Sequence, residues 1–151
     1  MTYEKRKRVF DLARQKMAEH GLQDWRFEWD SAKRRAGVCQ YGKRTIGMST
    51  VWAAGASEGA ILDTLLHEIA HALAGHEAGH GPRWRQIARS IGCSAERCAT
   101  ETEHMPKGRY EAVCRSCGRT VAWRWRLTDS IRNATHRSCG RAGTLRWVDH
   151  G

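Results

Sequence analysis

The residues best suited to chemistry are two histidines four positions apart, in the run His67-Glu68-Ile69-Ala70-His71. On an α-helix, residues four apart lie one above the other on one face, so both imidazoles can bind one metal ion. Zinc accepts such nitrogen donors, and a glutamate beside the first ligand can take a proton from a zinc-bound water. The spacing indicates hydrolysis at zinc, with Glu68 as the general base. The simpler alternative is a chance match whose histidines are solvated.

A catalytic zinc needs a third protein ligand beside an open position, and the sequence offers several candidates. The extended pattern HExxHxxGxxH is absent, because Ala74 and Glu77 stand where it requires glycine and histidine. His76 would point away from the other two histidines unless the helix ends first. His80 lies beyond two glycines, where the chain can turn back toward the metal. Later carboxylates are a further alternative: Glu96, Glu101 and Glu103.

The elements expected to position these residues form an α+β unit. Apolar residues recur at helical spacing in three segments, the second of which carries the histidine pair and is capped by Ser57. These helices are expected over residues 2–20, 58–75 and 82–92. Alternating apolar residues predict three strands that form a small antiparallel sheet. The strands are expected over residues 25–29, 36–41 and 44–49, and a loop of small residues over 53–56.

A second group of metal-binding residues lies near the C-terminus. Cys114-Arg-Ser-Cys117 is followed, eighteen residues later, by His136-Arg-Ser-Cys139. Two such pairs can close a tetrahedral zinc site with no free position, so this zinc is expected to be structural. A unit of about 45 residues needs such a site because it buries little apolar surface. The remaining cysteines are interpreted as non-ligands. Cys39 is expected to be a buried thiol, and Cys93 and Cys98 have no second pair with which to complete a metal site.

The net charge of +10 is concentrated at the C-terminal end. Residues 105–151 contribute +7 and residues 1–104 only +3. Between the two metal-binding pairs, residues 119–127 alternate as a strand, with tryptophans on one face and arginines on the other. Arginines hold phosphates and an exposed tryptophan stacks on an unpaired base, so single-stranded DNA is the expected partner. The candidate residues are Arg119, Trp123, Arg124, Trp125 and Arg126, although the tryptophans could instead be buried against the first unit.

Length and composition limit the class of protein. At 151 residues the chain is long enough for one domain and a small appendage, and a large multidomain enzyme is excluded. The hydrophobic content of 40% predicts a folded chain. The N-terminus is charged and no apolar run reaches membrane-spanning length, so a cytoplasmic, DNA-associated protein is expected, not a secreted or membrane protein.

The spacing of these motifs resembles that of the SprT-like metalloproteases, the family of the DNA-dependent protease Spartan. The resemblance rests on the HExxH run followed by His80-Gly81-Pro82-x-Trp84, and on the segment 36–41 ahead of the helix; it covers roughly residues 5–148. It implies that His80 is the third zinc ligand, that the substrates are proteins on or near DNA, as in DNA–protein crosslink repair, and that the zinc-binding appendage contacts the DNA.

The sequence therefore predicts a zinc metallopeptidase. Residues 1–104 are expected to form a zincin-like protease domain, and residues 105–151 a β-stranded zinc ribbon that binds nucleic acid. One catalytic and one structural Zn²⁺ are expected in a monomer. Two alternatives stay open: a non-catalytic nucleic-acid-binding zinc protein, and a repressor-cleaving metallopeptidase of the ImmA/IrrE type, which also uses HExxH.

Overall fold

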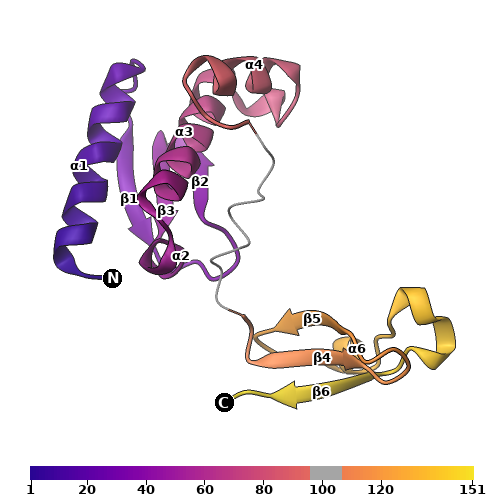
Figure 1. Cartoon of the computed structure of the whole chain (residues 1–151). Coiled ribbons are helices and arrows are strands. Elements are labelled where there is room, and N and C mark those ends of the chain that lie inside the picture. Colours follow the sequence, from indigo (N-terminus) through magenta and orange to yellow (C-terminus); the bar gives the residue numbers. More distant parts are fainter. Residues whose placement is uncertain (96–106) are drawn as a thin grey trace. The chain divides into compact units, whose positions relative to one another are not determined.

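The chain folds into two compact units, Met1–Pro106 and Lys107–Gly151. Figure 1 shows the computed structural model, which describes residues 1–95 and 107–151. Helices and small sheets make up the described residues, which confirms the predicted α+β class. Within these two ranges, no helix combines the length and the apolar character needed to cross a bilayer.

The three predicted helices of the first unit are present. They are α1 (Tyr3–Glu19), α3 (Glu58–Ala74) and α4 (Pro82–Ser90). Ser57 caps α3 as expected, because its hydroxyl accepts a hydrogen bond from the Ala60 amide at 3.2 Å. The expected loop at 53–56 was wrong, since a short helix, α2 (Thr50–Gly55), occupies most of it. The Ser49 side chain caps this helix, and the fully buried Trp52 holds it against the core.

The sheet of the first unit contains β1 (Arg26–Asp30), β2 (Gly37–Gln40) and β3 (Thr45–Ser49) in the order β1-β3-β2. A single 3₁₀ turn, η1 (Tyr41–Lys43), joins β2 to β3 as an antiparallel hairpin. The prediction of a wholly antiparallel sheet was wrong, because β1 pairs with β3 in parallel. The loop after β1 carries the chain to the far edge of β3, so β1 and β3 run in the same direction. The Asp30 carboxylate holds this loop by accepting from the Ala32 amide and Arg35, each at 2.8 Å.

The core of the first unit lies between the sheet and the helices α1 and α3, which also contact each other. Its largest fully buried side chains come from all of these elements. They include Met17, Ile46, Met48, Trp52, Ile61, Leu65, Ile69 and Trp84. Because α3 is buried over most of its length, His67 and Glu68 are also carried below the surface, with 6% and 5% of their area exposed.

The second unit is built on an antiparallel sheet of β4 (Tyr110–Cys114), β5 (Thr120–Arg124) and β6 (Leu145–Asp149), in the order β5-β4-β6. The short helix α6 (Asp129–Arg132) and the 3₁₀ segment η3 (Arg137–Ala142) connect β5 to β6 (Figure 1). The strand predicted over 119–127 ends earlier, at Arg124. Arg124 pairs with Tyr110, where β4 begins, so the residues that follow have no partner in β4.

Candidate metal centres

Three histidine side chains converge on one point of the first unit. His67 and His71 come from α3, and His80 follows the 3₁₀ turn η2 (His76–Ala78). The Nε2 atom of His71 lies 3.2 Å from that of His67 and 3.0 Å from that of His80, and the His67–His80 distance is 3.0 Å. Gly75 and Gly79 have positive φ angles of 86° and 48°, which let the chain reverse after α3 and return His80 to the helix.

The electrostatics of this group favour a metal ion at its centre. Burial, reinforced by the neighbouring histidines, lowers the pKa of His67 and of His71 to about 4, so both are neutral at pH 7. A neutral imidazole carries one donor and one acceptor, and three Nε2 atoms in mutual contact cannot all satisfy one another. A cation that receives a lone pair from each of the three Nε2 atoms would satisfy all of them. The group could therefore hold one metal ion.

Trp84 forms the surface against which the three histidines pack. Its ring centroid lies 4.6 Å from that of His67, 5.3 Å from that of His71 and 4.7 Å from that of His80. The indole Nε1 donates to the His67 carbonyl at 3.5 Å, and the side chain is 1% exposed. The sequence singled out Trp84 only as part of the family motif, and the structure shows that its ring contacts all three histidine rings and so restricts their orientation.

Glu68 is buried beside His67, against strand β2. A Cβ atom on Gly37 would lie 2.8 Å from both Cγ and Oε1 of Glu68, so only glycine lets the strand approach the carboxylate this closely. Cys39 lies on the same face of β2 as Gly37, and Tyr41 follows in η1. Burial above all raises the pKa of both Cys39 and Tyr41 to about 12, and the negative charge of Glu68 contributes. Gly37 was not among the predicted site residues, although a glycine inside a strand is a known sign of close approach.

Of the other candidate ligands that the structure describes, His76 and Cys93 lie outside this group. His76 is exposed in η2 and its ring packs against Tyr41, with 5.3 Å between centroids. Cys93 is buried, and its thiol donates to the Asp63 carbonyl at 3.7 Å. Cys98, Glu96, Glu101 and Glu103 lie outside the described residues.

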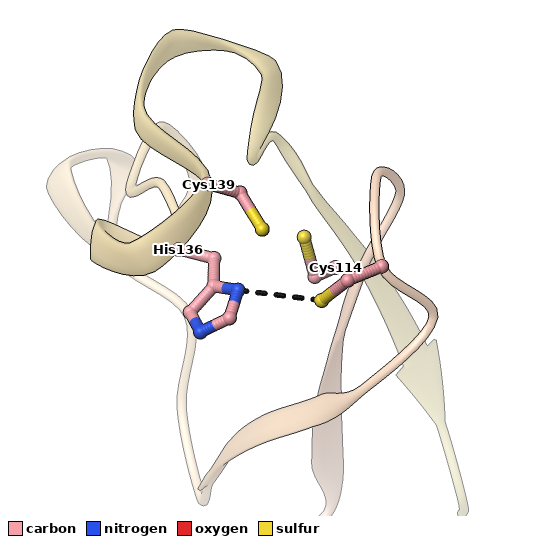
Figure 2. A group of neighbouring side chains, drawn as sticks. Cys114, His136 and Cys139 are labelled. Atoms are coloured by element: carbon pink, nitrogen blue, oxygen red, sulfur yellow. Dashed lines mark hydrogen bonds between the residues drawn. The ribbon is translucent and has the colours of Figure 1, made fainter.

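A second group of ligands forms in the Lys107–Gly151 unit. One donor atom from each of the four residues Cys114, Cys117, His136 and Cys139 lies within 4.8 Å of the others. Figure 2 shows the side chains of Cys114, His136 and Cys139 directed toward a common point. The backbone amide of Cys117 is the main cause that lowers the pKa of the Cys114 thiol to about 6, which favours the thiolate that a metal needs.

The two turns that present these ligands share one design. Each ends in Arg-Ser-Cys-Gly, and the glycines Gly118 and Gly140 adopt positive φ angles of 70° and 55°. In the first turn the Gly118 amide donates to the Cys114 carbonyl, and in the second the Cys139 amide donates to the His136 carbonyl, both at 2.9 Å. The first ligand of the first turn also ends β4, so the sheet and the turns together fix the site.

The five residues predicted to bind nucleic acid occupy different environments. Arg119 is exposed before β5, whereas Trp123 is half-buried, with its ring 5.0 Å from that of His150 and 5.0 Å from Lys107 Nζ. Arg124, Trp125 and Arg126 are exposed at the end of β5 and beyond it. Because β5 ends at Arg124, the strand alternation expected across 119–127 does not extend to Trp125 and Arg126.

Comparison with known proteins links the first unit to one family. A model of the SprT-like family matches residues 6–104, a range that contains the three-histidine group and stops before the second ligand group. Searches of curated proteins and of solved structures found no significant match.

Proposed function

The chain belongs to the SprT-like family, usually a metallopeptidase-type domain, and on this basis we propose that it is a zinc-dependent metallopeptidase that hydrolyses peptide bonds. The observation that carries the proposal is the convergence of three histidine Nε2 atoms, 3.0 to 3.2 Å apart, beside a buried glutamate. Three imidazole nitrogen donors suit a catalytic zinc, which keeps one position open for substrate. We take the helices and sheet that hold them as a zincin-like domain over residues 1–104.

In the proposed reaction, His67, His71 and His80 hold the metal and Trp84 keeps their rings in place. Zinc bound there supplies a Lewis acid that polarises the scissile carbonyl and lowers the pKa of a water. Glu68 takes the proton from the attacking water and later gives it to the leaving amine. Gly37 lets β2 press against Glu68 and so restricts where the carboxylate can lie.

Metal analysis of the wild type and of Glu68→Gln tests this proposal. We expect two zinc ions per chain in both proteins and loss of peptidase activity in the variant, because the amide cannot accept a proton. One zinc per wild-type chain would remove one of the two sites. Proteolysis by the variant at the wild-type rate would exclude the mechanism, whereas a zinc-loaded wild type without peptidase activity would favour a non-catalytic zinc protein.

For the second unit we propose a zinc ribbon over residues 105–151, with a structural zinc held by three thiolates and the His136 imidazole. The supporting observations are the closed four-ligand group and the charge of +7 on this segment. We further propose that the ribbon binds single-stranded DNA through the exposed side chains at the end of β5, and so brings a monomeric enzyme to proteins on or near DNA.

Salt-dependent binding of single-stranded DNA tests the role of the ribbon. Arg124→Ala combined with Arg126→Ala should weaken binding and reduce the slope of log K against log salt by about one to two, because two phosphate contacts are lost. The matched control is Arg132→Ala with Arg141→Ala, which removes the same charge elsewhere in the unit. Equal losses in the two double variants would mean that only net charge matters. Binding that does not depend on salt would contradict the proposal.

Digestion of a DNA-bound protein with and without added DNA then tests whether nucleic acid regulates cleavage. We expect faster cleavage when the substrate and the enzyme share one DNA strand. An enzyme of the ImmA/IrrE type would instead cut one repressor at one site, whether or not DNA is present.

A further inference from the structure

A pocket of about 670 Å³ opens beside the three-histidine group, on the side of α4. Six residues of the described chain line it: Gly79, His80, Trp84, Arg85, Arg89 and Ala95. Two of them, His80 and Trp84, belong to the proposed catalytic centre. The pocket therefore shares a wall with that centre, and whatever enters it lies next to a metal ligand.

The rest of the lining gives the pocket a strong positive charge. Arg85 and Arg89 are four residues apart on α4, so both guanidinium groups extend from one face of the helix. Both side chains are exposed, and neither has a carboxylate partner within residues 1–95 and 107–151. No acidic residue is among the six that line the pocket. Two arginines that have no carboxylate partner in the described part of the chain, beside a buried indole, form a site for an anion.

We infer that this pocket is a subsite for an acidic side chain of the protein substrate, so that cleavage is favoured next to aspartate or glutamate. The inference rests on the proposed peptidase function and names its specificity. A guanidinium group binds a carboxylate through two parallel hydrogen bonds, and the i, i+4 spacing supplies two such groups. The pocket is also within the size range of ligand sites and easily holds one amino-acid side chain.

The position of the pocket favours a peptide over nucleic acid as the source of the anion. Arginines also bind phosphate, but a DNA strand seated against His80 would occupy the place that the scissile peptide must take. A side chain of the peptide itself enters the pocket without this conflict, since its backbone already lies at the metal centre. Binding of the acidic side chain also adds to the energy that orients the scissile bond.

Matched peptides test the inference. The peptides are fluorogenic and differ only by glutamate or glutamine at one position near the scissile bond. Their cleavage is measured with three proteins: the wild type, the double variant Arg85→Ala with Arg89→Ala, and Arg83→Ala. Arg83→Ala is the matched control, because it removes a charge from the same helix but does not line the pocket. At one position the wild type and the control should favour glutamate by roughly five- to tenfold in kcat/KM, and the double variant should show a ratio near one.

A binding measurement separates this inference from the peptidase proposal. The zinc-loaded Glu68→Gln protein is titrated into the same labelled peptides, and anisotropy should show tighter binding of the glutamate peptide, lost on removal of Arg85 and Arg89. If no peptide is cleaved, the peptidase proposal fails and this titration decides the subsite alone. Equal affinity for the two peptides, or a preference retained in the double variant, would overturn the inference. If the double variant keeps the preference for the glutamate peptide and loses more affinity for single-stranded DNA than Arg83→Ala does, the two arginines bind nucleic acid and not the peptide. That result would also overturn the inference.

Discussion

At the scale of single residues, the chemistry of the first unit depends on how closely one strand approaches one carboxylate. Glu68 is held between α3 and β2, and Gly37 is the point of contact. A general base contributes fully only if its oxygen is positioned within a fraction of an ångström, because misplacement by about 1 Å can cost two orders of magnitude in rate. In the proposed mechanism Gly37 is thus a positioning residue, since it would act through Glu68 and not on the substrate.

The substitution Gly37→Ala should therefore reduce kcat by at least about tenfold while zinc content stays unchanged. The new Cβ would lie 2.8 Å from Glu68 Cγ and Oε1, so the carboxylate must move, whereas the three histidines stay in place. Steady-state kinetics combined with metal analysis measure both effects.

The matched control for this prediction is Gly42→Ala, in the turn that follows β2. An added Cβ at Gly42 meets nothing within 4 Å, and this variant should keep wild-type kcat. Equal activity of the two variants would show that the contact with β2 does not position Glu68.

At the scale of elements, α3 and the turn after it decide whether the metal site forms. The helix brings two histidines onto one face, but the third arrives only because α3 ends at Ala74 and the chain reverses through Gly75 and Gly79. α4 then packs against α3 and inserts Trp84 beneath the histidine rings. At the end of α4, Asp63 of α3 accepts hydrogen bonds from the Ser94 amide at 2.7 Å and its hydroxyl at 2.8 Å, which holds the two helices together.

The Ser57 cap allows a test of how much the N-terminal end of α3 contributes to the stability of the first unit. Ser57→Ala removes the hydrogen bond to the Ala60 amide and should lower the free energy of unfolding of the first unit by about 1 kcal/mol. Urea unfolding followed by circular dichroism measures the change. Ser57→Asp keeps an acceptor at the cap and should retain stability close to that of the wild type; if it loses as much as Ser57→Ala, the cap is not the cause.

At the scale of the whole molecule, we expect the two units to depend to different degrees on the metal ions that they could hold. The first unit has a core that spans α1, α3, α4 and the mixed sheet. Among the described residues, this core includes none from the second unit. The only buried apolar side chains described in the second unit are those of Ala112 and Cys114. A unit of this size buries too little apolar surface to fold without an additional constraint.

Removal of zinc should therefore affect the two units differently. Chelation should abolish peptidase activity and unfold residues 107–151, whereas the first unit keeps its fold. Amide NMR spectra of the zinc-bound and chelated protein measure this, with readdition of zinc as the control for reversibility. Well-dispersed signals from the second unit after complete chelation would contradict a structural role for its metal.

The sequence alone predicted most of the candidate ligands, because their signals are local. His67 and His71 lie four positions apart on one helix, and the members of each C-terminal pair lie three positions apart in one turn, so each pair comes together wherever its helix or turn forms. The helices and most strands followed from periodicity for the same reason, since one face of each must be buried. The spacing of the residues leaves several candidates for the third ligand, and only the family resemblance selects His80.

Only the tertiary structure decided the features that depend on which surfaces meet. Strand alternation does not encode the direction of pairing, so the parallel contact between β1 and β3 could not be predicted. β5 ends at Arg124 because its partner β4 begins at Tyr110, not because its own pattern changes. The approach of Gly37 to Glu68, and the pocket that joins Arg85 and Arg89 to His80, likewise arise between segments that are distant in sequence or separated by a turn. Local chemistry thus fixed what the centre contains, and packing fixed what surrounds it.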